Sequence, residues 1–235
     1  MAARAISERV TSPALLIRRT SLRDSDLIVG LFSEQCGAVS AVARGARRTS
    51  KRFSALEPMH LLSITVELSR GRELGTLKEA SVARPRIGLT SSLAAMEAAG
   101  TALRWLRLAA PSLTPEPLLW HEINALLDAL DEPDAAPGAQ LAAAGIRMLA
   151  ASGWALQLSA CVRCSTACPQ RARVMVDIAA GGVVCTRCGG GTIQLSSRDR
   201  HAIVGLERAG RLDDRAAASA LRLVRLAFDA HALSR

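Results

Sequence analysis

Two strand-like runs, Leu61–Leu68 (LLSITVEL) and Leu74–Val82 (LGTLKEASV), decide the fold that this sequence predicts. Within the first run, apolar and polar residues alternate from Ile64 to Leu68, which is the pattern of a strand with one buried face. The residues between the runs, 69–72 (SRGR), have the composition of a turn. Two strands separated by a turn are therefore expected here.

Three more strand-like runs precede this pair, and turn-forming residues separate them. The runs are Leu15–Arg19, Leu27–Phe32 and Val39–Ala43, with turns at 23–26 (RDSD) and 33–37 (SEQCG). Five strands in about 70 residues fit a small closed barrel, and the OB-fold is the commonest five-stranded form. We therefore predict an OB-fold nucleic-acid-binding domain over residues 1–85, with an SH3-like barrel as the alternative.

The remainder, residues 86–235, is expected to be helical, which gives an α+β fold class. Arg84-Pro85 ends the barrel, and Ser91 or Ser92 can cap a helix that runs to Leu108. That helix is expected to place four apolar residues on one side: Leu93, Met96, Leu103 and Leu106. Four further helices are expected at Leu118–Leu130, Ala139–Ser152, Ser197–Ala209 and Asp213–Ala232.

Charge is distributed unevenly along the 235 residues, whose formal net charge is +9. Residues 1–90 carry +7, residues 91–160 carry −4 and residues 161–235 carry +6. Two basic ends around an acidic middle indicate that the ends face a polyanion such as nucleic acid.

Four of the six cysteines form two C-x-x-C pairs, Cys161 with Cys164 and Cys185 with Cys188. A two-residue gap lets both thiolates of one turn bind the same ion, so two such knuckles predict a Cys₄ zinc finger at about residues 159–192. Four thiolates leave no open coordination position, so the Zn²⁺ is expected to be structural, and chelation is expected to loosen this insert before the barrel.

The other cysteines leave alternatives open. Cys168 follows Cys164 at the spacing of part of a ferredoxin motif, so an iron–sulfur cluster and reduced free thiols are the other interpretations. Cys36 lies in a predicted turn and is expected to be a small buried residue or an idle thiol.

A basic loop, residues 44–52 (RGARRTSKR), follows the third predicted strand. Its cations are the candidate contacts to the nucleic-acid backbone: Arg44, Arg47, Arg48, Lys51 and Arg52. The predicted barrel contains only two aromatic residues, Phe32 and Phe53, so binding is expected to be electrostatic and salt-sensitive rather than based on stacking.

The last predicted helix carries a second candidate set, Arg215, Arg222 and Arg225. At about 100° per residue these arginines fall within about 80° of arc, apart from the apolar face formed by Leu221, Val224 and Phe228. They could contact DNA or an acidic protein tail, or simply be solvated.

Motifs for catalysis or membrane insertion are absent from the sequence. It contains no P-loop and no G-x-S-x-G, and H-E-x-x-H fails at Ala125 after His121-Glu122. The four histidines are scattered, so no enzyme is predicted. No signal peptide or membrane span is recognised, so a cytoplasmic protein with reduced cysteines is expected.

The order of several short motifs resembles the RecO family of bacterial recombinational repair. The motifs are residues 24–26 (DSD), 31–37 (LFSEQCG), 43–48 (ARGARR), 56–58 (LEP) and 74–79 (LGTLKE), followed by the two C-x-x-C pairs. Arg44 stands where a lysine is common in the family, which preserves the charge, and Cys168 is an additional thiol.

The resemblance implies an OB-fold, a helical domain with a zinc finger, and a mediator of recombination. Such a protein binds single- and double-stranded DNA, anneals complementary strands, and works with RecR to load RecA onto strands covered by single-strand-binding protein, whose C-terminal tail is an expected partner. The location implied is the cytoplasm, with the nucleoid. The alternatives are a zinc-ribbon scaffold for protein interactions and an RNA or transcription factor.

Overall fold

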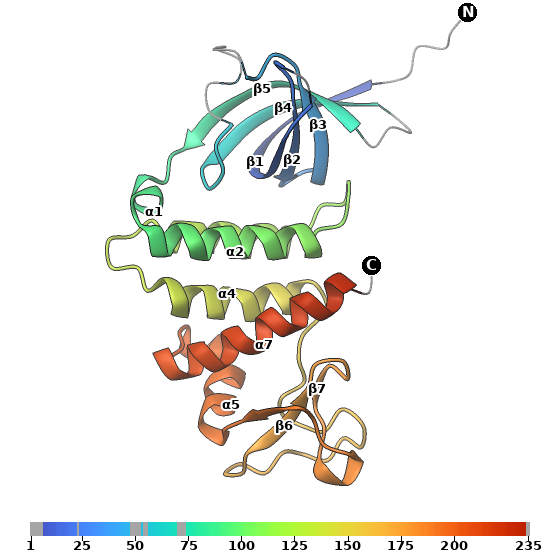
Figure 1. Ribbon diagram of the computed structural model, residues 1–235, viewed down its shortest axis with the longest axis vertical. Helices are drawn as coiled ribbons and strands as arrows, with labels where there is room; N and C mark the ends of the chain where they lie inside the picture. Colours follow the sequence, from blue (N-terminus) through green and yellow to red (C-terminus); the bar gives the residue numbers. More distant parts are fainter. Residues whose placement is uncertain (1–6, 23, 48–52, 54–55, 70–73, 234–235) are drawn as a thin grey trace, which may run out of the picture. The chain divides into compact units, whose positions relative to one another are not determined.

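The computed structural model describes residues 7–22, 24–47, 53, 56–69 and 74–233 (Figure 1). Its contacts divide the chain into two compact units. The first consists of residues 1–93 and 109–121, and the second of residues 94–108 and 122–235. Among the described residues, no helix has both the length and the apolar character needed to cross a membrane.

The first unit contains the predicted five-stranded barrel. Its strands are β1 (Ser7–Ser21), β2 (Leu27–Ser33), β3 (Gly37–Ala43), β4 (Leu61–Ser69) and β5 (Leu74–Arg84). They close in the order β1-β2-β3-β5-β4, and β3 and β5 are the parallel pair. The prediction of an OB-type barrel followed by a helical part is confirmed.

Strand β1 is long enough to pair with two neighbouring strands, which closes the barrel. Its first half, from Ser7 to Ala14, pairs with β4, and its second half, from Ala14 to Ser21, pairs with β2. The change of partner falls at Ala14, and the pairing with β2 then shifts register between Leu16 and Arg18, as at a β-bulge. The predicted strand, Leu15–Arg19, covered only part of the second half.

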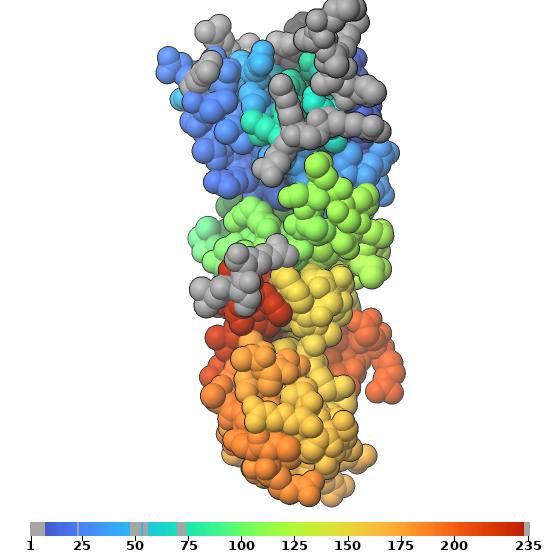
Figure 2. Space-filling model, turned by 90° about the vertical axis from the view of Figure 1, so that its right-hand side faces the viewer, coloured from blue at the N-terminus to red at the C-terminus, as the bar shows by residue number. Residues whose placement is uncertain are grey.

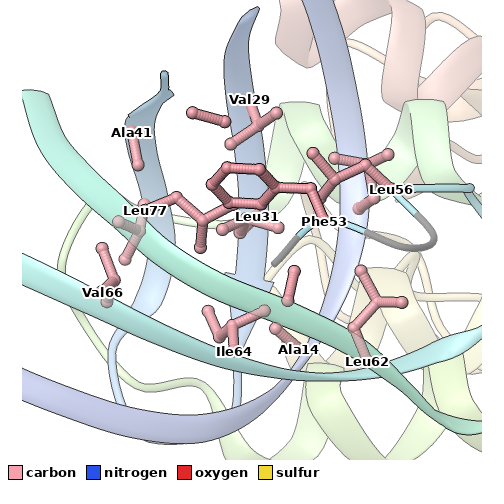
Figure 3. Packing of buried hydrophobic residues seen from close by; sticks show 14 of the residues in the cluster. Ala14, Val29, Leu31, Ala41, Phe53, Leu56, Leu62, Ile64, Val66 and Leu77 are labelled. Atoms are coloured by element: carbon pink, nitrogen blue, oxygen red, sulfur yellow. The ribbon is translucent and has the colours of Figure 1, made fainter. Parts of the chain in front are cut away.

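The barrel interior is filled by alternate residues of all five strands, as the alternating sequence pattern required. Leu31, Leu62, Ile64 and Leu77 are each at most 2% exposed. Figure 3 shows the ring of Phe53 among these side chains. Phe53, the residue after the basic loop, also pairs with Ala80 of β5 in an isolated bridge.

A segment between two helices extends the first unit beyond the strands. The amide of Ala38 donates to the carbonyl of Pro111, and the amide of Leu113 donates to the carbonyl of Ala38. Phe32, which is fully buried, contacts the ring of Trp120 at a centroid distance of 5.9 Å.

The helices are α1 (Ile87–Ser91), α2 (Leu93–Ala109), α3 (Pro117–Ala129), α4 (Pro137–Ala151), α5 (Ser197–Val204), α6 (Leu206–Ala209) and α7 (Asp214–Leu233). Helix α1 was not predicted: Ser91 is its last residue, where its hydroxyl donates to the carbonyl of Ile87, and Ser92 follows in an extended conformation that ends the helix. The predicted helix Ser197–Ala209 is divided at Gly205, a poor helix former.

The buried face of α2 differs in part from its prediction. Leu103 and Leu106 are buried, but Met96 is half-buried and Leu93, in the first turn, is 68% exposed. Buried alanines occupy the part of this face where Leu93 was expected. The face centres on Trp105, whose ring stacks on that of Phe228 in α7 at a centroid distance of 5.0 Å.

A small sheet that was not predicted carries the cysteine segment. Strands β6 (Val174–Asp177), β7 (Gly182–Val183) and β8 (Ile193–Leu195) pair antiparallel in the order β7-β6-β8. Their apolar residues belong to the same core as Ile203, Leu206 and Leu223 of the helices. The segment is therefore packed into the second unit and is not a separate insert with its own core.

Candidate metal centre and nucleic-acid interface

The four predicted metal ligands come together. The first knuckle, Cys161–Cys164, precedes β6, and the second knuckle, Cys185–Cys188, follows β7 and contains the 3₁₀ turn Thr186–Cys188. All four sulfur atoms lie within 4.8 Å of one another, and the Sγ atoms of Cys164 and Cys185 are 3.7 Å apart. A tetrahedral ion with Zn–S bonds of about 2.3 Å needs sulfur–sulfur edges of about 3.8 Å. The donor set therefore fits such an ion.

Left-handed residues shape both knuckles. Ser165 follows the first knuckle with φ +57°, and Gly189 follows the second with φ +104°. These conformations fold the chain back, so that the amide of Ser165 donates to the carbonyl of Cys161 and that of Gly190 donates to the carbonyl of Cys185. Gly189 and Gly190 adopt these left-handed conformations at little cost, because glycine has no Cβ.

Three of these thiols have shifted pKa values, which arise from hydrogen bonds and from the neighbouring thiols. The backbone N–H of Cys185 donates to Cys161 Sγ at 3.4 Å and is the main cause that lowers the pKa of Cys161 to about 6. A hydrogen bond with Thr166 lowers the pKa of Cys164. The neighbouring thiols Cys185 and Cys164 raise the pKa of Cys188 to about 12. Four thiolates at this spacing repel one another, and a divalent cation among them removes the repulsion.

The other two cysteines lie outside this group. Cys168 is half-buried, its amide donates to the carbonyl of Ser159, and burial raises the pKa of its thiol. Cys36 is half-buried in the turn between β2 and β3, and burial raises its pKa as well. The prediction that Cys36 is not a ligand agrees with its place on the barrel core.

The basic loop begins from a fixed point. The amide of Gly45 donates to Asp26 Oδ1 at 2.9 Å, and the amide of Arg47 donates to the carbonyl of Ser25 at 3.1 Å. The acidic turn before β2 thus holds the start of the loop. Arg44 and Arg47 are both exposed. The candidate residues Arg48, Lys51 and Arg52 lie outside the described residues.

Aromatic side chains are occupied with packing. All six of them lie within the described residues. Phe32, Phe53, Trp105 and Phe228 are buried, and Trp120 and Trp154 are half-buried. A row of exposed rings for stacking bases is therefore missing from the described surface.

The three arginines of α7 are all exposed, but their surroundings differ. Arg215 Nε lies 3.6 Å from Asp199 Oδ1, and Asp199, in α5, is only 5% exposed. The hydroxyl of Ser219 donates to the other oxygen of that carboxylate at 2.9 Å. Arg215 therefore helps to neutralise a buried charge, and no local pattern in the sequence predicts this pairing. Arg222 and Arg225 lie on the same helix at exposed positions.

The histidines lie on separate elements. The backbone amide of Arg86 donates to His60 Nδ1, His231 stacks on Trp154 at 4.1 Å, and His121 and His201 are exposed on α3 and α5. Among the described residues, the only cluster of three or more potential metal ligands is the four-cysteine group. In the space-filling view, the knuckle segment, in orange, lies at the surface of the second unit (Figure 2).

Fold and site together define a class of protein: a closed OB-type barrel followed by a helical part that carries paired cysteine knuckles. Comparison with known proteins gives the family. The family models "Recombination protein O N terminal" and "Recombination protein O C terminal" match residues 7–86 and 91–234.

Individual relatives agree. The chain is 34% identical over 207 residues to the DNA repair protein RecO of Anaeromyxobacter sp. (strain K), which covers 86% of this chain and 81% of the relative. It is 32% identical over 184 residues to the RecO protein of Nocardioides sp., an alignment that covers 74% of this chain and 72% of the relative. It is 29% identical over 185 residues to that of Geobacter metallireducens, which covers 77% of this chain and 73% of the relative. The chain belongs to the RecO family of DNA repair proteins.

Proposed function

We propose that this protein is a non-enzymatic mediator of recombinational repair that binds single- and double-stranded DNA and anneals complementary strands. The observation that carries the proposal is a cationic loop on an OB-type barrel whose aromatic residues are packed inside. A cationic surface screens the repulsion between two phosphate backbones, and without stacking it leaves the base edges available for pairing.

Further parts of the proposal come from family membership. The barrel, residues 1–85, is the main DNA-binding domain, and residues 86–235 form the helical domain with the metal segment at about 159–192. The protein works with RecR to load RecA onto strands covered by single-strand-binding protein, in the cytoplasm at the nucleoid. Arg222 and Arg225 of α7 are additional candidate contacts to DNA.

We propose Zn²⁺ as the resident metal, with a structural role. All four donors are thiolates, and their spacing matches a tetrahedral ion with bonds of the Zn–S length. When bound, the ion would connect the two knuckles and leave no position for a substrate.

An annealing assay over a series of salt concentrations, with and without single-strand-binding protein, tests the DNA function. Neutralising Arg47, Arg48 and Arg52 to Gln should slow annealing and lower the salt dependence of single-strand binding by about 2 in log–log slope, since each phosphate contact contributes about 0.7. Arg104→Gln, at an exposed position of α2 in the acidic middle of the sequence, is the matched control. Unchanged annealing in the triple variant would overturn the proposal for this loop.

Protein binding is the second candidate function, and a cavity in the second unit favours it. The cavity has a volume of about 400 Å³, and its apolar wall comes mainly from alanines of α3 and α4, together with Leu126 and Leu212. Its rim carries Arg147 and Arg211 together with carboxylates. We propose that the apolar end of the tail of single-strand-binding protein binds in this cavity. If tail binding survives the loop variants, the protein surface and the DNA surface are separate.

A further inference from the structure

The two knuckles share one feature beyond their cysteines: an arginine occupies the same position in both. Arg163 lies in Cys161-Val162-Arg163-Cys164, and Arg187 lies in Cys185-Thr186-Arg187-Cys188. Each guanidinium crosses to the opposite knuckle. Arg163 Nη1 donates to the carbonyl oxygen of Cys188 at 2.7 Å, and Arg187 Nη2 donates to Thr166 Oγ1 at 3.2 Å. The contacts are reciprocal and connect the same two turns that supply the four thiols.

Thr166 extends one of these contacts to a sulfur atom. Its Oγ1 lies 3.3 Å from Cys164 Sγ. A metal-bound thiolate has no proton to donate, so in the loaded state the hydroxyl must donate to the sulfur and its oxygen must accept from Arg187. The arginine of the second knuckle thus supports a thiolate of the first through one intervening hydroxyl.

The two guanidinium groups also balance the charge that four thiolates and a divalent ion would carry. Four thiolates around one divalent ion carry a formal charge of −2, which two guanidinium groups can balance. Asp177 Oδ2 lies 4.0 Å from Arg163 Nη2 and offsets part of the charge on that side. Within the described part of the chain Arg187 forms no ion pair with a carboxylate, so its charge acts mainly on the thiolate side.

We propose that Arg163, Arg187 and Thr166 are positioning residues that hold the two knuckles closed around the metal ion and set the rate at which the ion leaves. The proposal rests on metal binding by the four cysteines and is independent of the proposed DNA function. Hydrogen-bonding partners of metal ligands in other proteins change metal affinity by about 10- to 100-fold when they are removed. An effect of that size is expected here.

The experiment uses the full-length zinc-loaded protein and follows transfer of Zn²⁺ to an excess of a chromophoric chelator. Arg187→Gln and Thr166→Val should each release zinc about 10-fold faster than the unchanged protein. Because both act on Cys164, the double variant should release it no faster than the quicker single variant. Arg163→Gln acts on the other knuckle, so its effect should multiply with that of Arg187→Gln. Arg171→Gln, at an exposed arginine in the same segment, is the control and should leave the rate unchanged.

A spectroscopic measurement separates positioning from a general loss of structure. In the cobalt-loaded protein, Thr166→Val should shift the thiolate-to-cobalt charge-transfer band at full intensity, and Thr166→Ser should restore the band position. Release rates equal to that of the control would overturn the proposal, as would purified protein that contains no bound metal. DNA annealing, measured on the same samples, should remain unchanged, so a failure here is distinguishable from failure of the DNA function.

Discussion

Gly37→Ala should strongly destabilise the barrel, because this glycine combines a left-handed backbone with a very close approach to another part of the backbone. Its φ is +68°, and a Cβ atom added to it would lie 1.9 Å from the carbonyl oxygen of Thr114 and 2.9 Å from the amide nitrogen of the same residue. The segment around Thr114 would have to retreat by about 1 Å or more to reach even the shortest tolerable contact.

The expected magnitude follows from what that retreat breaks. The hydrogen bonds that join Ala38 to Pro111 and Leu113 are 3.3 Å and 2.9 Å long, and losing both costs about 2 kcal/mol. The left-handed conformation costs an alanine about 1 kcal/mol more. Gly37→Ala should therefore destabilise β2 and β3 by about 3 kcal/mol.

Gly45→Ala provides a matched control. Its φ is +71°, nearly that of Gly37, but no atom lies within 4 Å of the added Cβ. This variant should lose only about 1 kcal/mol, the conformational part. The difference between the two variants isolates the steric contact with Thr114.

Native-state hydrogen exchange on peptides from β2 and β3 measures both effects in the full chain. Exchange should accelerate by about 100-fold in Gly37→Ala and about 5-fold in Gly45→Ala, since about 1.4 kcal/mol corresponds to a factor of ten. Equal acceleration in the two variants would show that segment 111–114 does not hold the β2–β3 turn, and the reasoning would be refuted.

Two further predictions concern ion pairs. Lys78 and Arg9 hold the pKa of Glu67 below its usual value, so Glu67 stabilises the folded state above the ordinary glutamate pKa, and this contribution is lost as the pH falls through the lowered folded pKa. Urea midpoints measured from pH 6 to pH 3 should fall less steeply in Glu67→Gln, and identical slopes would contradict the assignment. Arg215→Gln should lower the urea midpoint by the equivalent of about 1 kcal/mol, because it leaves the carboxylate of Asp199 without its ion pair. Arg225→Gln, an exposed arginine of the same helix, should leave the midpoint unchanged, and equal effects would argue against the pairing.

The features that the sequence predicted well are those that leave a local pattern. Alternation at Ile64–Leu68 fixed a strand, because every second residue of a strand in a barrel wall faces the core. The C-x-x-C spacing predicted which four cysteines come together, since two cysteines on one tight turn share a direction. Helices α3, α4 and α7 were found within a few residues of their bounds.

Other features depend on partners that are distant in the sequence. The first half of β1 is polar and contains Pro13, so it has little strand character of its own; pairing with β4 makes it a strand. Strands β6, β7 and β8 have four, two and three residues, too few to show a period. The pairing of Asp199 with Arg215 joins two helices and has no local signature.

Binding of the proposed Zn²⁺ would also change how the charge of this chain should be interpreted. The formal net charge of +9 counts every cysteine as neutral, as does the +6 of residues 161–235. A zinc ion held by four thiolates adds −2 to that region, which reduces its net charge to about +4, whereas residues 1–90 keep their +7. Two arginines of the metal segment, Arg163 and Arg187, are moreover engaged between the knuckles. The barrel is therefore the more strongly cationic surface once the metal is bound, which is why the loop after β3, rather than the metal segment, is the better place to seek the DNA contact.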